Sequence, residues 1–184
     1  MWWLKAMGVL LTVGAGALLG LEVAARWGRR PRRLLELRSA LALLETEMTV
    51  GRTPLPEAAE HVASLAPGVE VERFFHQLAL DLKAGESAEV AWRRGAEGLI
   101  PTDQTLVLLA RRLTREEAAD LEPFVLLGGV IGATGLDDQL KHLQLARERL
   151  AGRERLATEE AARLVPLYRY AGVAAGLLVA LLLV

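Results

Sequence analysis

The residues that most often carry out chemistry in proteins are few in this sequence and lie far apart. Its three histidines, His61, His76 and His142, contain no pair at the i, i+4 spacing that presents two metal ligands on one helix face. Cysteine is absent, which excludes disulfides and thiolate metal sites. No serine has the strand–turn–helix setting of a hydrolase nucleophile. We therefore predict no catalytic residue, no metal or cofactor site and no small-molecule substrate.

A glycine-rich stretch at residues 128–135 is the nearest approach to a phosphate-binding loop. Such a loop follows a strand and ends in Lys-Ser or Lys-Thr, and this stretch has neither the context nor the ending. We interpret it as a tight connection between two helices. Anion binding is the minor alternative.

Acidic residues gather where one expected helix ends and the next begins. Glu45 and Glu47 lie two residues apart, so both cannot face a core. Glu57 and Glu60 lie in or near the next helix's first turn, where the helix dipole favours negative charge. The functional interpretation is an acidic surface of Glu45, Glu47 and Glu57 that binds a basic partner. The alternative is a solvated helix face.

A basic cluster follows the first apolar segment, and its members are Arg26, Arg29, Arg30, Arg32 and Arg33. Because the cluster adjoins a segment of membrane length, it is typical of contact with anionic lipid head groups. It lacks the interleaved aromatic residues that stack on nucleic-acid bases. The chain's net charge of −1 creates no field that would favour a polyanion. We predict lipid contact and no nucleic-acid binding.

The amino-terminal segment is long and apolar enough to cross a membrane. Residues 2–21 carry only one charge, Lys5, and ~20 residues at ~1.5 Å each match the ~30 Å hydrocarbon layer. The alternative is a cleaved signal peptide, with a small-x-small site at Ala15 and Ala17. The dense basic cluster after the segment is the reverse of a signal peptide's charge order, and we therefore predict a membrane helix.

The carboxyl-terminal segment is apolar as well. Residues 171–184 carry no charge, and residues 167–170 are expected to complete a span of membrane length. Gly172 and Gly176 form a small-xxx-small pair, which allows another helix to approach closely in lipid. The alternative is a buried core helix at the end of the chain.

Arginines set the expected orientation of the two spans. They follow the first span and precede the second, so the positive-inside rule predicts a cytoplasmic middle and two outside termini. The expected domains are residues 1–25, an N-terminal transmembrane helix; residues 26–166, a cytoplasmic helical domain; and residues 167–184, a C-terminal transmembrane helix.

The spacing of apolar residues predicts helices throughout the middle of the chain. One stripe recurs at intervals of three and four residues, with Pro31 expected in its first turn: Leu34, Leu37, Leu41, Leu44 and Met48. A second helix is expected to begin at Thr53 as N-cap with Pro54 in its first turn. Further helices are expected at about 74–85 and 87–97.

A fifth helix is expected after Pro101 and Thr102, with its apolar face formed by Leu106, Leu109 and Leu113. Pro123 and the glycine-rich stretch interrupt the pattern, and a long helix from 137 to about 165 then leads through Pro166 into the terminal span. The predicted fold is all-α: a cytoplasmic bundle of about six helices flanked by an N-terminal and a C-terminal transmembrane helix.

Several motifs resemble the stage III sporulation protein AB family of endospore-forming bacteria. They are Gly-Leu-Glu-Val-Ala at 20–24, Arg-Pro-Arg-Arg-Leu at 30–34, Leu-Arg-x-Ala-Leu-x-x-Leu-Glu-x-Glu-Met at 37–48, Thr-Pro-Leu-x-Glu-Ala at 53–58, Asp-Gln-x-Lys-His-Leu at 138–143 and Gly-Val-x-Ala-Gly-Leu-Leu at 172–178. Between about residues 69 and 132 the resemblance is limited to helical character.

The resemblance implies a subunit of the channel apparatus between mother cell and forespore, placed in the mother-cell membrane facing the forespore. It also implies similarity to the platform proteins of type II secretion and type IV pilus machines. The expected role is a non-enzymatic platform or adaptor, whose partners are membrane lipid, a cytoplasmic hexameric ATPase and other channel subunits. The alternatives are a platform of a secretion or pilus system outside sporulation, and a membrane-bound helical hydrolase.

Overall fold

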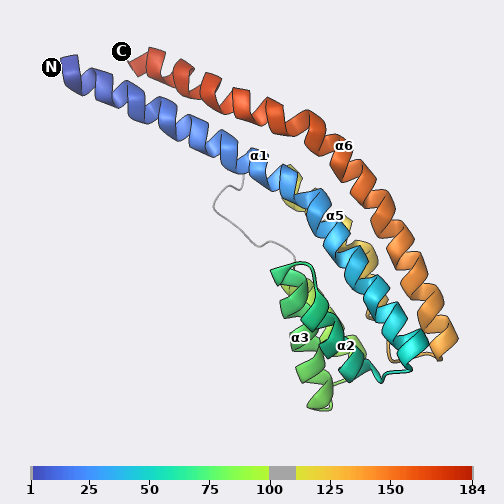
Figure 1. Cartoon of the computed structure of the whole chain (residues 1–184). Helices are drawn as coiled ribbons and strands as arrows, with labels where there is room; N and C mark the ends of the chain where they lie inside the picture. The colour runs from blue at the N-terminus through green and yellow to red at the C-terminus, as the bar shows by residue number, and fades with distance from the viewer. Residues whose placement is uncertain (1, 100–110, 184) are drawn as a thin grey trace. The chain divides into compact units, whose positions relative to one another are not determined.

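The computed structural model describes residues 2–99 and 111–183. Within these ranges the chain forms six α-helices, one short π-helical segment and no strand, which confirms the predicted all-α class (Figure 1). The elements are α1 (Trp2–Thr46), the π-helical segment η1 (Glu47–Gly51), α2 (Leu55–Leu65), α3 (Val69–Lys83), α4 (Ala88–Gly98), α5 (Arg111–Leu127) and α6 (Leu136–Leu183).

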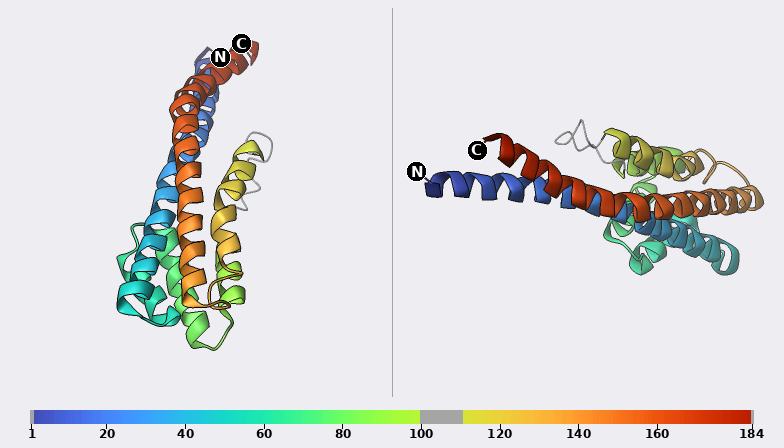
Figure 2. Two further views of the ribbon diagram at one scale, coloured as in Figure 1. Left: turned by 90° about the vertical axis from the view of Figure 1, so that its right-hand side faces the viewer. Right: turned by 90° about the horizontal axis from the view of Figure 1, so that it is seen from above.

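The chain divides into two compact units. The terminal unit consists of Met1–Pro31 with Arg155–Val184, and the central unit consists of Arg32–Glu154. In the terminal unit the first part of α1 and the last part of α6 run side by side, with the two chain ends at the same end of the pair (Figures 1 and 2). In the central unit α2 packs on α3, α3 on α4, and α4 on α5.

Both long helices contain a stretch that is long and apolar enough to cross a membrane. Large apolar side chains on these stretches are exposed, as Leu10, Leu18 and Leu181 show. A soluble protein would leave such surfaces in water at a cost of ~25 cal/mol for each Å². The apolar ends are therefore candidate membrane spans.

The candidate spans are not separate helices. α1 continues through Pro31, so the prediction that Pro31 lies in a first turn is wrong. Proline inside a helix loses one hydrogen bond and crowds the carbonyl four residues earlier. The side chains of Trp27 and Leu34, on either side of Pro31, are both buried, and burial of a helix face offsets an unfavourable residue within the helix. α6 likewise continues through Pro166, so the expected domain boundaries at 25/26 and 166/167 fall inside helices.

The predicted apolar stripe of the first central helix is buried, as expected. Leu34, Leu37, Leu41 and Leu44 are at most 1% exposed, and Met48 is 5% exposed. The helix ends through η1, after which Arg52 takes the left-handed backbone conformation with φ 48°. The stripe therefore forms the α1 side of the core of the central unit.

Aromatic side chains form the other side of this core. Phe74 of α3 meets Phe75, Trp92 of α4 and Phe124 of α5 with ring centroids 4.9–5.0 Å apart. The indole N–H of Trp92 donates a hydrogen bond of 2.8 Å to the carbonyl of Phe124. This bond satisfies the one polar atom of a fully buried tryptophan.

Two local predictions about helix boundaries are wrong. α2 begins at Leu55 without a side-chain cap, because the Thr53 hydroxyl donates instead to the Glu47 carboxylate at 3.1 Å. Pro123 lies inside α5, which continues to Leu127. The expected start of the fifth helix at Pro101 and Thr102, with Leu106 and Leu109, lies outside the described residues, whereas Leu113 is buried.

Candidate functional site

The described part of the chain offers no arrangement for metal chemistry. Within residues 2–99 and 111–183, no group of three or more histidine, aspartate or glutamate side chains is placed to hold a metal ion. The Nδ1 atom of His61 lies 3.2 Å from the Glu47 carboxylate, and His76 and His142 are exposed.

Glycines form a close helix contact in the terminal unit. A Cβ atom added to Gly172 would lie 2.6 Å from the carbonyl oxygen of Gly16 and 2.7 Å from the Cα atom of Gly20. A Cβ atom at Gly176 would lie 2.9 Å from the Cα atom of Val13. Side chains cannot occupy these positions without separation of the helices. The predicted packing glycines Gly172 and Gly176 therefore face α1 of the same chain.

The sequence prediction missed the matching pair on α1. A Cβ atom at Gly16 would lie 2.8 Å from the Gly172 carbonyl oxygen, and one at Gly20 would lie 2.6 Å from the Tyr168 carbonyl oxygen. Gly16 and Gly20 have the same four-residue spacing as the pair on α6. Two small-xxx-small pairs in one chain, each in an apolar segment, are the pattern that would have predicted the contact.

Arg30 joins the same two helices through charge. Its side chain is 3% exposed, and its guanidinium donates a 2.8 Å hydrogen bond to Glu160 of α6. The guanidinium also lies 4.8 Å from the centre of the Trp27 ring, within the range of a cation–π interaction. A buried cation needs such partners because its desolvation costs several kcal/mol. Arg30 is therefore held inside the helix pair.

The other members of the basic cluster differ in exposure. Arg26 and Arg29 both pair with Glu22, and Arg32 pairs with Glu36. Arg33 pairs with Glu70 at 2.8 Å and donates to the carbonyl of Leu99. The side chains of Arg29 and Arg32 are 65% and 78% exposed. Contact with anionic lipid stays a prediction, and these two residues are the exposed cations available for it.

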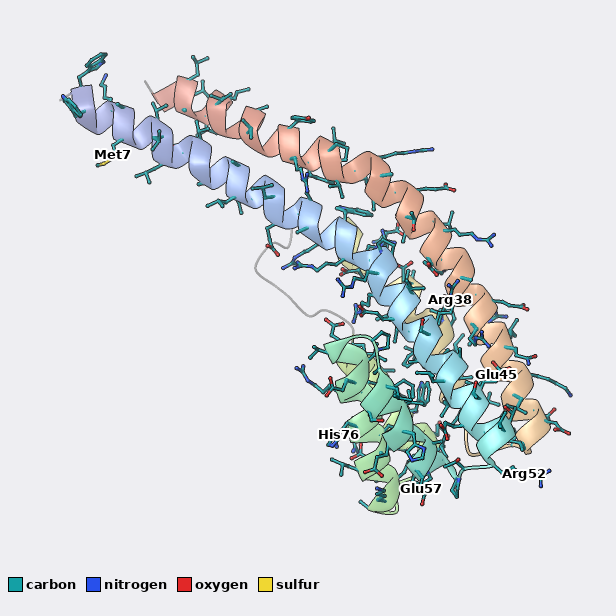
Figure 3. The ribbon with its side chains drawn as sticks, viewed as in Figure 1. Met7, Arg38, Glu45, Arg52, Glu57 and His76 are labelled. Carbon is teal, nitrogen blue, oxygen red and sulfur yellow. The ribbon has the colours of Figure 1, made fainter. Side chains whose placement is uncertain are left out.

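The predicted acidic surface is largely occupied by internal pairs. Glu45 binds Arg147 and Gln144 of α6, and its side chain is 15% exposed. Glu47 accepts from Thr53 and contacts His61. Figure 3 shows Glu45 beside α6 and Glu57 on α2, so the two carboxylates have different neighbouring helices. Partner binding stays a prediction, and Glu57 is the exposed member without an ion pair in the described part of the chain.

Two further ion pairs at the surface, Glu60 with Lys83 and Arg94 with Glu86, shift the pKa of one partner towards its charged form. A hydrogen bond from Lys83, together with its positive charge, lowers the pKa of the Glu60 carboxyl. A hydrogen bond to Glu86, together with its negative charge, raises the pKa of Arg94. Glu60 therefore stays ionised and Arg94 stays protonated at neutral pH.

The glycine-rich stretch acts as a connection between α5 and α6. A Cβ atom at Gly128 would lie 2.6 Å from the Cδ1 atom of Trp92, so glycine lets this turn pack directly on the indole. Gly132 has φ 80°, which side-chain-bearing residues rarely adopt. The two glycines therefore serve packing and turn geometry, in agreement with the interpretation as a helix–helix connection.

Comparisons with known proteins give one family. Residues 5–184 match the family model of stage III sporulation protein AB (spore_III_AB). Stage III sporulation protein AB of Bacillus subtilis (strain 168) is 32% identical over 181 residues, which cover 98% of this chain and 99% of the relative. A solved structure of a stage III sporulation protein AB is similar with a TM-score of 0.57 and 25% identity, over 72% of this chain and 96% of the other.

The glycine contact predicts that Gly172→Leu will separate the helices of the terminal unit. Because the new side chain would overlap backbone atoms of α1, we expect a loss of ~1–3 kcal/mol, the range of overpacking. The control is Gly14→Leu, since a Cβ atom at Gly14 meets nothing within 4 Å. Thermal unfolding of both variants in the same detergent, followed by circular dichroism, makes the comparison. Equal melting temperatures for the two variants would contradict a close glycine contact.

The Glu45 pair predicts that this residue stabilises the central unit. Glu45→Arg would place a cation beside Arg147, and we expect a loss of ~1–3 kcal/mol because a hydrogen-bonded charge loses its partner. The double variant Glu45→Arg with Arg147→Glu exchanges the charges and should recover much of that loss. Unfolding of the native chain, both single variants and the double variant completes the cycle. No recovery in the double variant would show that the two side chains act independently.

Proposed function

Because the chain belongs to the stage III sporulation protein AB family, we propose that it is a non-enzymatic membrane platform of the sporulation channel apparatus. In this role the two apolar segments hold the protein in the mother-cell membrane and contact other channel subunits. The helical central unit lies in the cytoplasm and docks a hexameric ATPase.

The observation that carries the proposal is the continuity of the two long helices. α1 and α6 each contain a candidate membrane span, and each continues as a helix of the central unit. In each helix the apolar part and the amphipathic part follow one another without an intervening loop. The same helices that are anchored in lipid therefore supply the core of the partner-binding domain, as an adaptor requires.

The orientation follows from the distribution of arginines around the spans. Arginines lie after the apolar part of α1 and before the apolar part of α6, so both spans favour a cytoplasmic central unit. The burial of Arg30 and the pairing of Arg33 do not alter this argument, because the rule concerns the side of the membrane on which a cation is placed.

The family match favours sporulation over a secretion or pilus system outside it, since the model covers both spans and the central unit. The hydrolase alternative lacks a supporting site in the described residues. The charged side chains that are brought together there form ion pairs across helices, such as Arg38 with Glu154 at 3.0 Å.

The orientation predicts the reactivity of a cysteine placed in the central unit. The chain has no cysteine of its own, so Ser87→Cys supplies a single thiol at the start of α4. We expect an impermeant maleimide to leave this thiol unlabelled in intact mother-cell protoplasts and to label it after lysis. The control is a single cysteine at Trp2, which should react in intact protoplasts. Labelling of the Ser87 variant before lysis would place the central unit outside.

The adaptor role predicts a sporulation defect without loss of any enzymatic reaction. Deletion of the gene in its source organism should block sporulation at stage III, and the native gene should restore heat-resistant spores. Glu57→Arg should reduce copurification of the ATPase, because like charges across an interface are unfavourable. Glu72→Arg on α3 is the matched control, since Glu72 is also exposed. Normal sporulation of the deletion strain would contradict the proposed function.

A further inference from the structure

The central unit contains a groove that none of the internal pairs fills. It has a volume of about 360 Å³ and is lined by residues of α1, α3 and α4 with Leu99. Phe74, Gly95, Gly98 and Leu99 give it an apolar floor. A Cβ atom at Gly98 would meet nothing within 4 Å, so this glycine opens directly onto free space.

The charged residues of the groove are mostly basic. Arg33, Arg73 and Arg94 line it together with one acidic residue, Glu70, among the residues that the structure describes. Arg33 is paired with Glu70, and Arg94 is paired with Asp81 and Glu86. Arg73 is exposed and makes no ion pair within the described ranges. It therefore offers a guanidinium whose five N–H donors are available to an external carboxylate.

We propose that this groove binds an acidic segment of a partner protein. A carboxylate of that segment pairs with Arg73, and a neighbouring apolar side chain covers Gly98 and Leu99. The proposal goes beyond the docking of the ATPase, because it concerns a basic surface on α3 and α4 and does not involve Glu57. It holds whether or not the ATPase is the partner.

The combination of an apolar floor with an unpaired arginine favours a peptide over other anions. A free phosphate would use the cations alone and leave the floor uncovered. A lipid head group presents the same phosphate chemistry to the cations, and short-chain phosphatidylglycerol serves as its probe in the test below. An acidic peptide segment uses both features of the groove, as peptide recognition by arginine clusters does.

The test uses the full chain in a neutral detergent and two fluorescent peptides. In one peptide leucine alternates with glutamate, and in the other leucine alternates with lysine. We expect salt-sensitive binding of the glutamate peptide, seen as increased anisotropy, and none of the lysine peptide. Arg73→Glu should weaken binding at least about tenfold, because it places like charges in contact. Gly98→Leu should weaken it similarly by filling the groove.

Matched controls lie on α6. Arg149→Glu reverses another exposed arginine, and Gly152→Leu adds the same side chain at another open helical glycine; neither should change binding. Circular dichroism checks folding, and Arg73→Glu decides the question if Gly98→Leu does not fold. The proposal is overturned if the glutamate peptide does not bind at up to ~1 mM, or if binding survives Arg73→Glu. It is also overturned if short-chain phosphatidylglycerol, rather than the peptide, binds in a manner that depends on Arg73.

Discussion

The antiparallel pairing of α1 with α6 has to hold one register in both units of the chain. In the terminal unit Gly20 faces Gly172 and Arg30 meets Glu160. In the central unit Arg38 meets Glu154, and Glu45 meets Arg147. Each step towards the carboxyl end of α1 is matched by a nearly equal step towards the amino end of α6. Since one residue turns a helix by ~100°, a slip of a single residue within either unit would break the contacts of that unit.

The two units secure this register by different physical means. In the proposed membrane setting of the terminal unit, apolar side chains gain little by leaving lipid, so close approach of backbones at glycine is the favourable contact. In the central unit, burial of the leucine stripe and the aromatic cluster supplies the stability. The ion pairs there are partly exposed and contribute modestly, but they distinguish the correct register from shifted ones. Glycine contacts with one ion pair in the terminal unit, and ion pairs with apolar burial in the central unit, thus specify the pairing of α1 with α6.

Local patterns predicted the helices well, because periodicity needs only neighbouring residues. The stripe through Leu41 was buried as expected, and both apolar ends form helices. At Pro31 the helix continues where a first turn was expected, and at Thr53 the hydroxyl donates to the Glu47 carboxylate instead of capping α2. The ion-pair partners of the charged residues could not be predicted from the sequence, for a different reason. Arg30 and Glu160 are 130 residues apart, and no local pattern indicates which distant residue a charge will meet.

The division of charges between internal pairs and free surface decides which residues are left for partners. A charge that already holds the register, such as Glu45, cannot be given to a partner without loosening α1 from α6. Glu57 and Arg73 form no ion pair in the described part of the chain, so a partner can bind them without a change in the fold. They lie on α2 and α3 and have opposite charge. An adaptor built in this way would bind basic and acidic surfaces at separate places on α2 and α3, while α1 and α6 keep their own pairing intact.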